Sequence, residues 1–173
     1  MKKTFLILFL FSLIFNSVAQ ENEKFPQDIN KKHELKINVL TLIAAKWIDV
    51  SYEKLINEES SFGLSAAINT DTDETDLNYQ ITPFYRRYFS GKFARGFFVE
   101  GFGSLFSARN YDDFFSTQQE FETGFALGVS VGGKFVSKQG FTTELLLGVG
   151  RNLSGDTDYE GFGRIAISVG YRF

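Results

Sequence analysis

The stretch GFGRIAISVGYRF, residues 161–173, alternates between two kinds of side chain. Ile165, Ile167, Val169, Tyr171 and Phe173 form one set, whereas arginine, alanine, serine and glycine form the other. A repeat of two residues indicates a β-strand with one apolar face. A soluble sheet buries that face in a core, whereas a membrane barrel turns it to lipid, so the orientation of the faces decides the class of protein.

The segment 120–136 gives the best indication of this orientation because it is the longest alternating run. Its odd positions are bulky and apolar, and its even positions are mostly small. A soluble sandwich would carry bulky polar residues on its water-facing side. Small residues instead suit the crowded lumen of a narrow eight-stranded barrel. The pattern therefore predicts that the apolar face points outward and that the small face points inward.

Eight alternating segments are expected in total. They cover 35–43, 47–55, 61–69, 77–89, 97–108, 120–136, 141–150 and 161–173. Several reach the ~9–11 residues that a tilted strand needs to cross a bilayer, whereas soluble strands usually have ~5–6. After the signal peptide, no stretch has a convincing period of 3.6 residues, so the helix content there is expected to be close to nil.

The connections between these segments alternate in length. NEES, SGKFAR and SKQG are compact, whereas TDTDETD, RNYDDFFSTQQ and RNLSGDTDYE are long, and a short loop is expected near Ala44 and Ala45. Short periplasmic turns and long external loops are typical of outer-membrane barrels. In SKQGF, Gly140 can supply the left-handed residue of a three-residue hairpin loop. The expected fold is all-β: an eight-stranded antiparallel up-and-down transmembrane barrel of the small OmpA type.

The N-terminus, MKKTFLILFLFSLIFNSVAQ, has the features of a secretory signal peptide: two lysines, an apolar run and a small-residue cleavage site. The apolar run is shorter than the ~20 residues of a membrane-spanning helix. We expect residues 1–19 to be the signal peptide, 20–34 a flexible periplasmic lead and 35–173 the barrel.

Charge and composition exclude several classes of function. Without Lys2 and Lys3 the chain has 16 basic and 21 acidic side chains, a formal charge of −5, which disfavours a nucleic-acid partner. There is no cysteine, so no disulfide can support the fold. With 21 phenylalanines and 16 glycines, the composition suggests a sheet with large aromatic and very small residues side by side.

The same alternation of inward and outward positions, applied to all eight segments, predicts a charged lumen. The expected inward charges are Lys36, Asp49, Glu53, Arg86, Glu100, Glu122, Lys134, Glu144, Arg164 and Arg172. Only Lys54 and Arg87 fall on outward faces, both near the periplasmic ends of their strands. If paired residue numbers sum to 186 and 278 in two hairpins, Arg86 lies opposite Glu100 and Lys134 opposite Glu144. Such cross-strand pairs offset the cost of burying charge, so these residues are interpreted as structural.

Motifs for chemistry are weak. His33 is the single histidine and lies in the polar lead, which makes a Ser/His triad at the barrel wall remote. One histidine and no cysteine cannot form a zinc cluster. Two acidic runs could gather Ca²⁺ but lack the calcium-loop pattern: Asp71, Asp73, Glu74 and Asp76, and Asp156, Asp158 and Glu160. No catalytic, cofactor-binding or metal-ligating residue is assigned, and no cofactor is expected.

Three stretches resemble a known family: TPFYRRYFSGKFARGFFVEGF (82–102), GVSVGGKFVSKQGFTTELLLGVGRNL (128–153) and GRIAISVGYRF (163–173). They are similar to a Bacteroidota outer-membrane β-barrel family labelled only as a domain of unknown function, DUF3575. The resemblance rests on Pro83, Tyr85, Arg86, Gly96, Phe98, Glu100, Gly132, Lys134, Gly140, Gly148, Asn152 and Phe173. Residues 35–55 depart from the family pattern. The resemblance implies insertion into the outer membrane, with the aromatic end, Tyr171 and Phe173, as the signal, and it implies no activity.

The expected protein is a small barrel of the cell outer membrane with a filled lumen and a structural or surface-interaction role, without catalysis. Its expected partners are outer-membrane lipid and, during biogenesis, the insertion machinery; it is expected to be a monomer. The alternatives are a small-solute channel or ligand-binding barrel and a soluble periplasmic lipocalin-like barrel. A lumen filled by Trp47, Phe84, Phe98, Phe102 and Phe106 opposes the channel, and outward apolar faces oppose the lipocalin.

Overall fold

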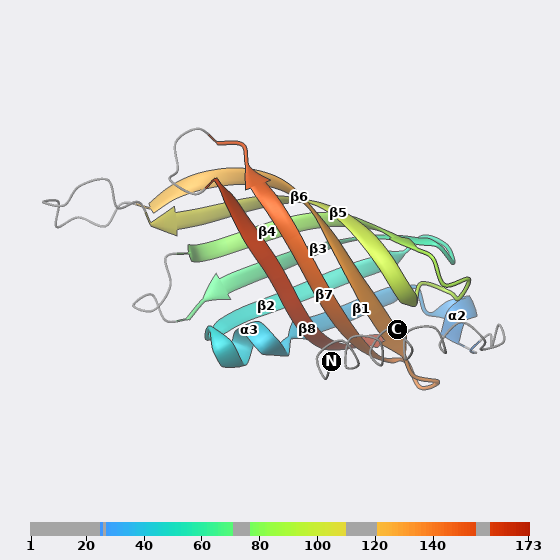
Figure 1. The fold of residues 1–173 in the computed structure, drawn as a ribbon. Helices are drawn as coiled ribbons and strands as arrows, with labels where there is room; N and C mark the ends of the chain where they lie inside the picture. The colour runs from blue at the N-terminus through green and yellow to red at the C-terminus, as the bar shows by residue number, and fades with distance from the viewer. Residues whose placement is uncertain (1–24, 26, 71–76, 110–120, 155–159) are drawn as a thin grey trace, which may run out of the picture.

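The structure is a computed structural model that describes residues 25, 27–70, 77–109, 121–154 and 160–173. Over these residues the chain forms eight antiparallel strands that pair in chain order, and the last strand pairs with the first to close a barrel (Figure 1). The strands are β1 (His33–Asn38), β2 (Trp47–Leu55), β3 (Ser60–Asn69), β4 (Leu77–Tyr88), β5 (Gly96–Arg109), β6 (Phe121–Val136), β7 (Phe141–Asn152) and β8 (Gly161–Arg172). The predicted all-β, eight-stranded barrel is confirmed.

The first strand differs from its predicted range of 35–43. It ends at Asn38, and residues Val39–Ala44 form helix α3 beside β2 and β8. The side-chain oxygen of Asn38 accepts the Thr41 N–H at 3.4 Å as a helix cap and the Ile167 N–H of β8 at 3.2 Å. The predicted strand is therefore wrong over residues 39–43, and α3 is a short departure from a helix content expected to be close to nil. It forms because one side chain caps the helix and also bonds the backbone of β8.

The two rims of the barrel differ in their connections, but the loop expected to be short near Ala44 and Ala45 covers residues 39–46 and contains α3. Residues 56–59, 89–95 and 137–140 connect strands at one rim, where β1 begins and β8 ends; we call it the turn rim. The opposite rim, the loop rim, is reached by residues 39–46, 70–76, 110–120 and 153–160. Gly140 has a φ of +103°, so the left-handed residue of the 137–140 turn lies where it was predicted.

The orientation of the faces is also as predicted. On β6 and β7 most large apolar residues point outward, with Leu127 50% and Leu147 60% exposed, whereas Leu146 is buried. The intervening positions, such as Ala126 and Lys134, are buried in the lumen. On β8, Ile165 points outward and Arg172 points inward. The outer face is therefore apolar, and the inner face carries the charges together with small residues and aromatic rings.

Phenylalanine rings in the lumen lie over glycines of the neighbouring strand. Phe106 covers Gly124, and a Cβ added at that glycine would overlap the ring. The same arrangement recurs four times in the described residues, at Phe84 over Gly63, Phe98 over Gly132, Phe102 over Gly128 and Phe162 over Gly150. A narrow barrel can hold so many rings because the opposing positions have no side chain. This pairing accounts for five of the 21 phenylalanines and five of the 16 glycines.

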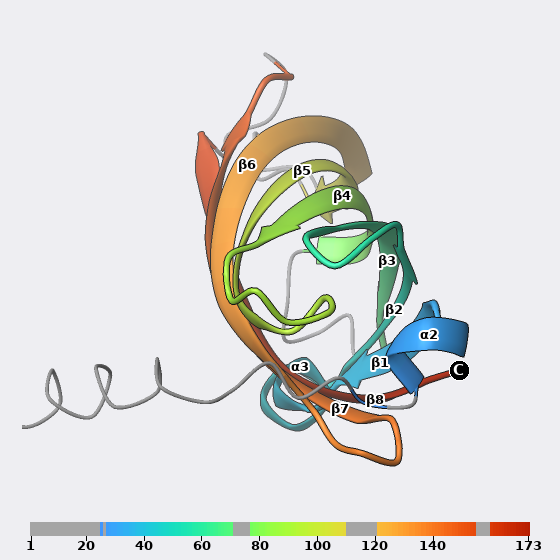
Figure 2. The ribbon, with the colours of Figure 1, turned by 90° about the vertical axis from the view of Figure 1, so that its right-hand side faces the viewer.

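Two segments cover the opening of the barrel at the turn rim. The connection between β4 and β5 curls into the end of the barrel (Figure 2), where Ala94 is buried. Helix α2 (Gln27–Asn30) lies next to it and carries the buried Asp28, and Phe25 lies against Arg95, whose Cζ is 3.8 Å from the ring centroid. Part of the segment 20–34, expected to be a flexible lead, is thus packed against the barrel, and β1 already begins at His33.

Among the residues that the structure describes, no helix is long and apolar enough to cross a membrane. The signal peptide expected at residues 1–19 lies outside the described part of the chain.

Candidate functional site

The lumen contains a cluster of eight charged side chains, four acidic and four basic, each at most 2% exposed. We call it the lumen ion cluster; it consists of Glu34, Lys36, Glu53, Arg86, Glu100, Lys134, Glu144 and Arg172. The alternation of β1, β2 and β4–β8 directs these side chains inward. Their formal charges cancel, and burial of this much charge is tolerated only when partners surround every ion.

Glu53 of β2 lies at the centre of this cluster. Its carboxylate accepts hydrogen bonds from Lys36 Nζ at 2.6 Å and Lys134 Nζ at 2.7 Å. It also accepts from Arg86 Nη1 at 2.9 Å, from the Tyr88 hydroxyl at 2.6 Å and from the Ser61 hydroxyl at 2.5 Å. Both oxygens are occupied by donors from β1, β3, β4 and β6, so this carboxylate has the role of a cross-lumen anchor.

Arg86 of β4 is the cationic counterpart. Its guanidinium donates to Glu100 at 2.6 Å, to Glu144 at 2.7 and 2.8 Å, and to Glu53. The rings of Phe84 and Phe98 lie on it, each with its centroid 4.4 Å from Arg86 Cζ. A planar, delocalised cation with several donors suits such a site, and a lysine would not fill it.

Lys134 and Glu144 occupy paired positions on β6 and β7, as the sum of 278 predicts, but they do not bond to one another. Lys134 Nζ instead reaches across the lumen to Glu34 at 2.8 Å and to Glu53. Glu144 accepts from Lys36 at 2.7 Å and from Arg86. Register alone did not reveal these partners, because long side chains in a narrow lumen reach strands that are not neighbours. By contrast, Arg86 both pairs with Glu100 in register and bonds to it.

Arg172 connects the cluster to the turn rim. Its guanidinium bonds Glu34 at 2.7 Å and Asp28 of α2 at 3.2 Å. It also donates to two carbonyl oxygens of the turn that follows β4, those of Phe93 at 3.3 Å and Ala94 at 2.9 Å. The residue before the C-terminus therefore holds both segments that cover the turn rim.

The remaining predicted lumen charges lie nearer the loop rim. Arg164 points inward and pairs with Glu100, with its side chain 15% exposed. Asp49 accepts from Asn38 at 3.1 Å. Glu122 also faces the lumen side of β6, and its Oε2 has no hydrogen-bond partner among the described residues. The structure thus extends the predicted set of charges over both halves of the lumen.

Sequence reasoning missed three buried charges. Glu34 lies two residues before Lys36 and shares its phase, so extending the alternation of β1 backwards would have found it. Asp28 and Arg95, which form an ion pair at 3.3 Å, lie outside the strands, where no periodicity marks a buried position.

The other candidates for chemistry lie apart from this cluster. His33 lies at the turn rim, where its Nδ1 is 2.5 Å from the Tyr52 hydroxyl and its ring stacks on Tyr52 and Phe173. No group of three or more His, Cys, Asp or Glu in the described ranges could hold a metal ion. Of the two acidic runs, the structure describes Glu160, which is exposed; the others lie outside the described residues.

Comparison with solved structures gives one distant similarity. The Yersinia pestis outer membrane protein Ail, studied in a phospholipid bilayer nanodisc, is similar over 83% of this chain and 100% of its own, with 12% identity and a TM-score of 0.35. Comparison with curated proteins gives no match. A family model, "Protein of unknown function (DUF3575)", matches residues 5–171, nearly the whole sequence. The chain therefore belongs to the DUF3575 family.

Proposed function

We propose that this protein is a β-barrel of the outer membrane with a closed lumen and a structural or surface-interaction role, and that it is not an enzyme. One observation carries the proposal: the barrel is apolar outside and charged inside. Outward Leu147 and Val149 are 60% and 66% exposed, whereas Arg86 and Glu53 are almost completely buried. This distribution of apolar and charged residues suits a lipid environment and is the reverse of that in a soluble lipocalin-like barrel.

Strand length supports the same location. Strands β4–β8 have 12, 14, 16, 12 and 12 residues, enough for the ~9–11 that a tilted strand needs to cross the bilayer. Exposed Tyr171 and Phe173 at the turn rim fit an aromatic end read by the insertion machinery. In this arrangement the turn rim is periplasmic and the loop rim faces outward. We expect the protein to be a monomer.

A filled lumen favours a structural role over transport. The lumen ion cluster and the buried rings of Trp47, Phe84, Phe98, Phe102 and Phe106 occupy it from the turn rim toward the loop rim. An eight-stranded barrel has an interior just wide enough for side chains, whereas water-filled porins have about 16–18 strands. The surface role is then left to the connections at the loop rim.

The location is tested with two substitutions at one lipid-facing position. Leu147→Arg places a charge in the apolar belt, which costs about 2–4 kcal/mol near the bilayer midplane, whereas Leu147→Phe keeps the position apolar. We expect the arginine variant to accumulate poorly in the outer membrane and to lose heat-modifiable migration in gels, and the phenylalanine variant to behave as wild type. Equal insertion of both variants would contradict the outward assignment of Leu147.

The channel alternative is tested by recording from the protein in planar bilayers. We expect no stable conductance from the wild-type protein, because side chains fill the lumen. Steady single-channel steps that disappear in Arg86→Ala or Lys134→Ala would favour the channel over the closed barrel.

The surface role is tested on intact cells with an epitope inserted within 110–120, and a second epitope within 137–140 is the matched control for the turn rim. Antibody should label only the first. Labelling of the second alone would reverse the assigned orientation.

A further inference from the structure

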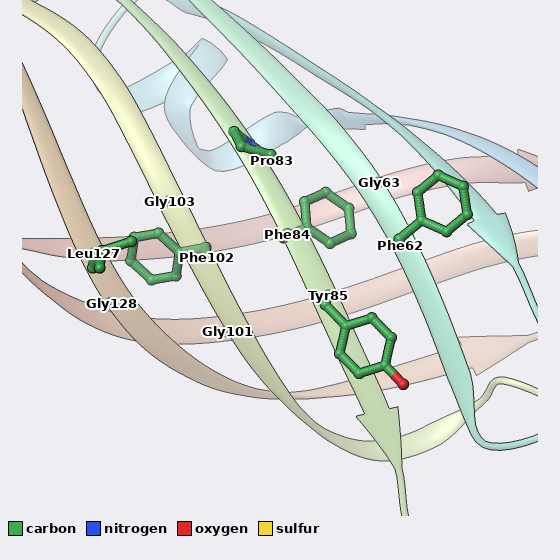
Figure 3. A pocket seen from close by; sticks show the side chains of 10 residues that line it. All are labelled: Phe62, Gly63, Pro83, Phe84, Tyr85, Gly101, Phe102, Gly103, Leu127 and Gly128. Atoms are coloured by element: carbon green, nitrogen blue, oxygen red, sulfur yellow. The ribbon is translucent and has the colours of Figure 1, made fainter.

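An open hollow of about 600 Å³ lies on the outer face of the barrel across β3–β6 (Figure 3). Phe62, Pro83 and Tyr85 line one side and Leu127 the other, while Gly101 and Gly103 of β5 lie between them. The hollow is shallow and open to the surroundings of the barrel, and its lining is mostly apolar.

The hollow exists because two successive outward positions of β5 are glycine. Tyr85 of β4 pairs with Gly101, and Leu127 of β6 pairs with Gly103. The outer surface is therefore lower along β5 than along the larger side chains of the two neighbouring strands. A Cβ added at Gly101 would meet no atom within 4 Å. Val99 and Leu105, the next outward residues of β5, are exposed and bound the trough along the strand.

Positive charge lies at the turn-rim end of this trough. Arg87 follows Tyr85 by two residues on the same face of β4, and Lys54 of β2 lies beside Phe62, with its Nζ 6.0 Å from the ring centroid. Arg87 bonds Glu59 at 2.5 Å, but both side chains are more than half exposed. Such a surface pair is weak and leaves the guanidinium available to an anion.

The distance between charge and trough fits within one leaflet. From Arg87 to Pro83 the strand advances four residues, or about 13 Å at ~3.3–3.4 Å per residue. Because strands of such barrels tilt by ~35–45°, this corresponds to about 10 Å of depth, which lies within one half of the ~30 Å hydrocarbon core. A lipid whose phosphate lies at Arg87 would therefore place an acyl chain along the glycine floor.

We propose that this hollow binds one acyl chain of a phospholipid from the periplasmic leaflet, with its phosphate at Arg87 and Lys54. The inference rests on the proposed outer-membrane location. Apolar walls and a floor without side chains recognise the chain, and the two cations select an anionic phosphate at the turn rim.

The test uses native mass spectrometry of the protein folded in detergent micelles, with palmitoyl-oleoyl phosphatidylglycerol as the probe and lipid A in a parallel arm. Gly101→Leu fills the trough. Gly133→Leu is the matched control, because Gly133 is also an outward glycine with open space around its Cβ position but does not line the hollow. Arg87→Gln removes the headgroup contact. Should Gly101→Leu fail to fold, Gly103→Val replaces it.

We expect wild type and Gly133→Leu to retain one phosphatidylglycerol, Gly101→Leu or Gly103→Val to retain at least tenfold less, and Arg87→Gln to retain several-fold less. Equal retention in the trough-filling variant and its control would overturn the proposal, as would preferential retention of lipid A. Heat-modifiable migration of each variant is measured in parallel. If the wild-type protein folds and inserts into membranes but binds no lipid, only the proposed lipid site is contradicted. If the wild-type protein fails to insert, the proposed function is contradicted.

Discussion

The two halves of the lumen are filled by different means. Toward the turn rim, the lumen ion cluster joins strands across the barrel: Lys134 of β6 bonds Glu34 of β1, and Arg86 of β4 bonds Glu144 of β7. Toward the loop rim the charges are fewer among the described residues, and contacts between rings and glycines prevail: Phe106 packs against Gly124 on the adjacent strand. In the turn-side half, side chains from non-adjacent strands bond to one another across the lumen. In the loop-side half, each ring and its glycine lie on adjacent strands.

This difference predicts how strongly substitutions in each half should reduce stability and how strongly they should be coupled. A charge removed from the cluster leaves several buried ions without a partner, and the cost is shared by distant strands. A misfit between a ring and its glycine is local and can be relieved at the partner residue. Substitutions in the turn-side half should therefore be more costly and more strongly coupled than those in the loop-side half.

The largest effect is expected at Glu53. Glu53→Gln keeps the shape of the side chain but removes the negative charge that faces Lys36, Lys134 and Arg86. We expect a loss of about 3–5 kcal/mol in the free energy of unfolding, the usual cost of breaking a buried ion pair. Urea unfolding in detergent micelles, followed by the fluorescence of Trp47, measures it.

Glu59→Gln is the control for Glu53→Gln, because Glu59 pairs with Arg87 on the exposed surface. We expect it to change stability by less than about 1 kcal/mol. Equal effects of the two substitutions would show that the cluster contributes no more than a surface salt bridge.

A double-mutant cycle at Arg86 and Glu100 sharpens the comparison. Either single alanine substitution leaves a charge unpaired in the lumen, whereas the double variant removes both members of a 2.6 Å ion pair. We expect a coupling energy of about 1–3 kcal/mol from the same unfolding experiment. A coupling of zero would mean that these side chains do not act as a pair.

A smaller and more local effect than at Glu53 is expected in the loop-side half. Gly124→Ala pushes a Cβ into the Phe106 ring and should cost about 1–3 kcal/mol, and Phe106→Leu in the same chain should recover part of that loss. Gly163→Ala is the control, because a Cβ there meets nothing within 4 Å. An equal loss at Gly124 and Gly163 would point to the backbone, not to the ring, as the cause.

Much of this architecture could be predicted because a lipid-facing barrel repeats a period of two on every strand. The facing of β6, the register of Arg86 with Glu100 and the left-handed Gly140 all follow from alternation and turn chemistry. Helix α3 could not be predicted this way, since it depends on Asn38 bonding both Thr41 and the backbone of a strand far along the chain.

The lumen charges illustrate the same limit. Periodicity assigns each one to a face, but the identity of its partner depends on reach across the interior, as the bonds of Lys134 demonstrate. Asp28 precedes the first strand and carries no pattern at all, so its bond to Arg172 emerges only in three dimensions.

The position of Arg172 at the end of the last strand has a consequence for closure of the barrel. Its partners Glu34 and Asp28 lie near the start of the barrel, and β1 and β8 meet only when the cylinder closes. Until that moment Arg172, Glu34 and the carbonyl oxygens of Phe93 and Ala94 lack their native partners. Closure of the barrel and pairing of Arg172 with Glu34 and Asp28 are thus one step, so these ion pairs stabilise the closed barrel and contribute nothing to the open sheet.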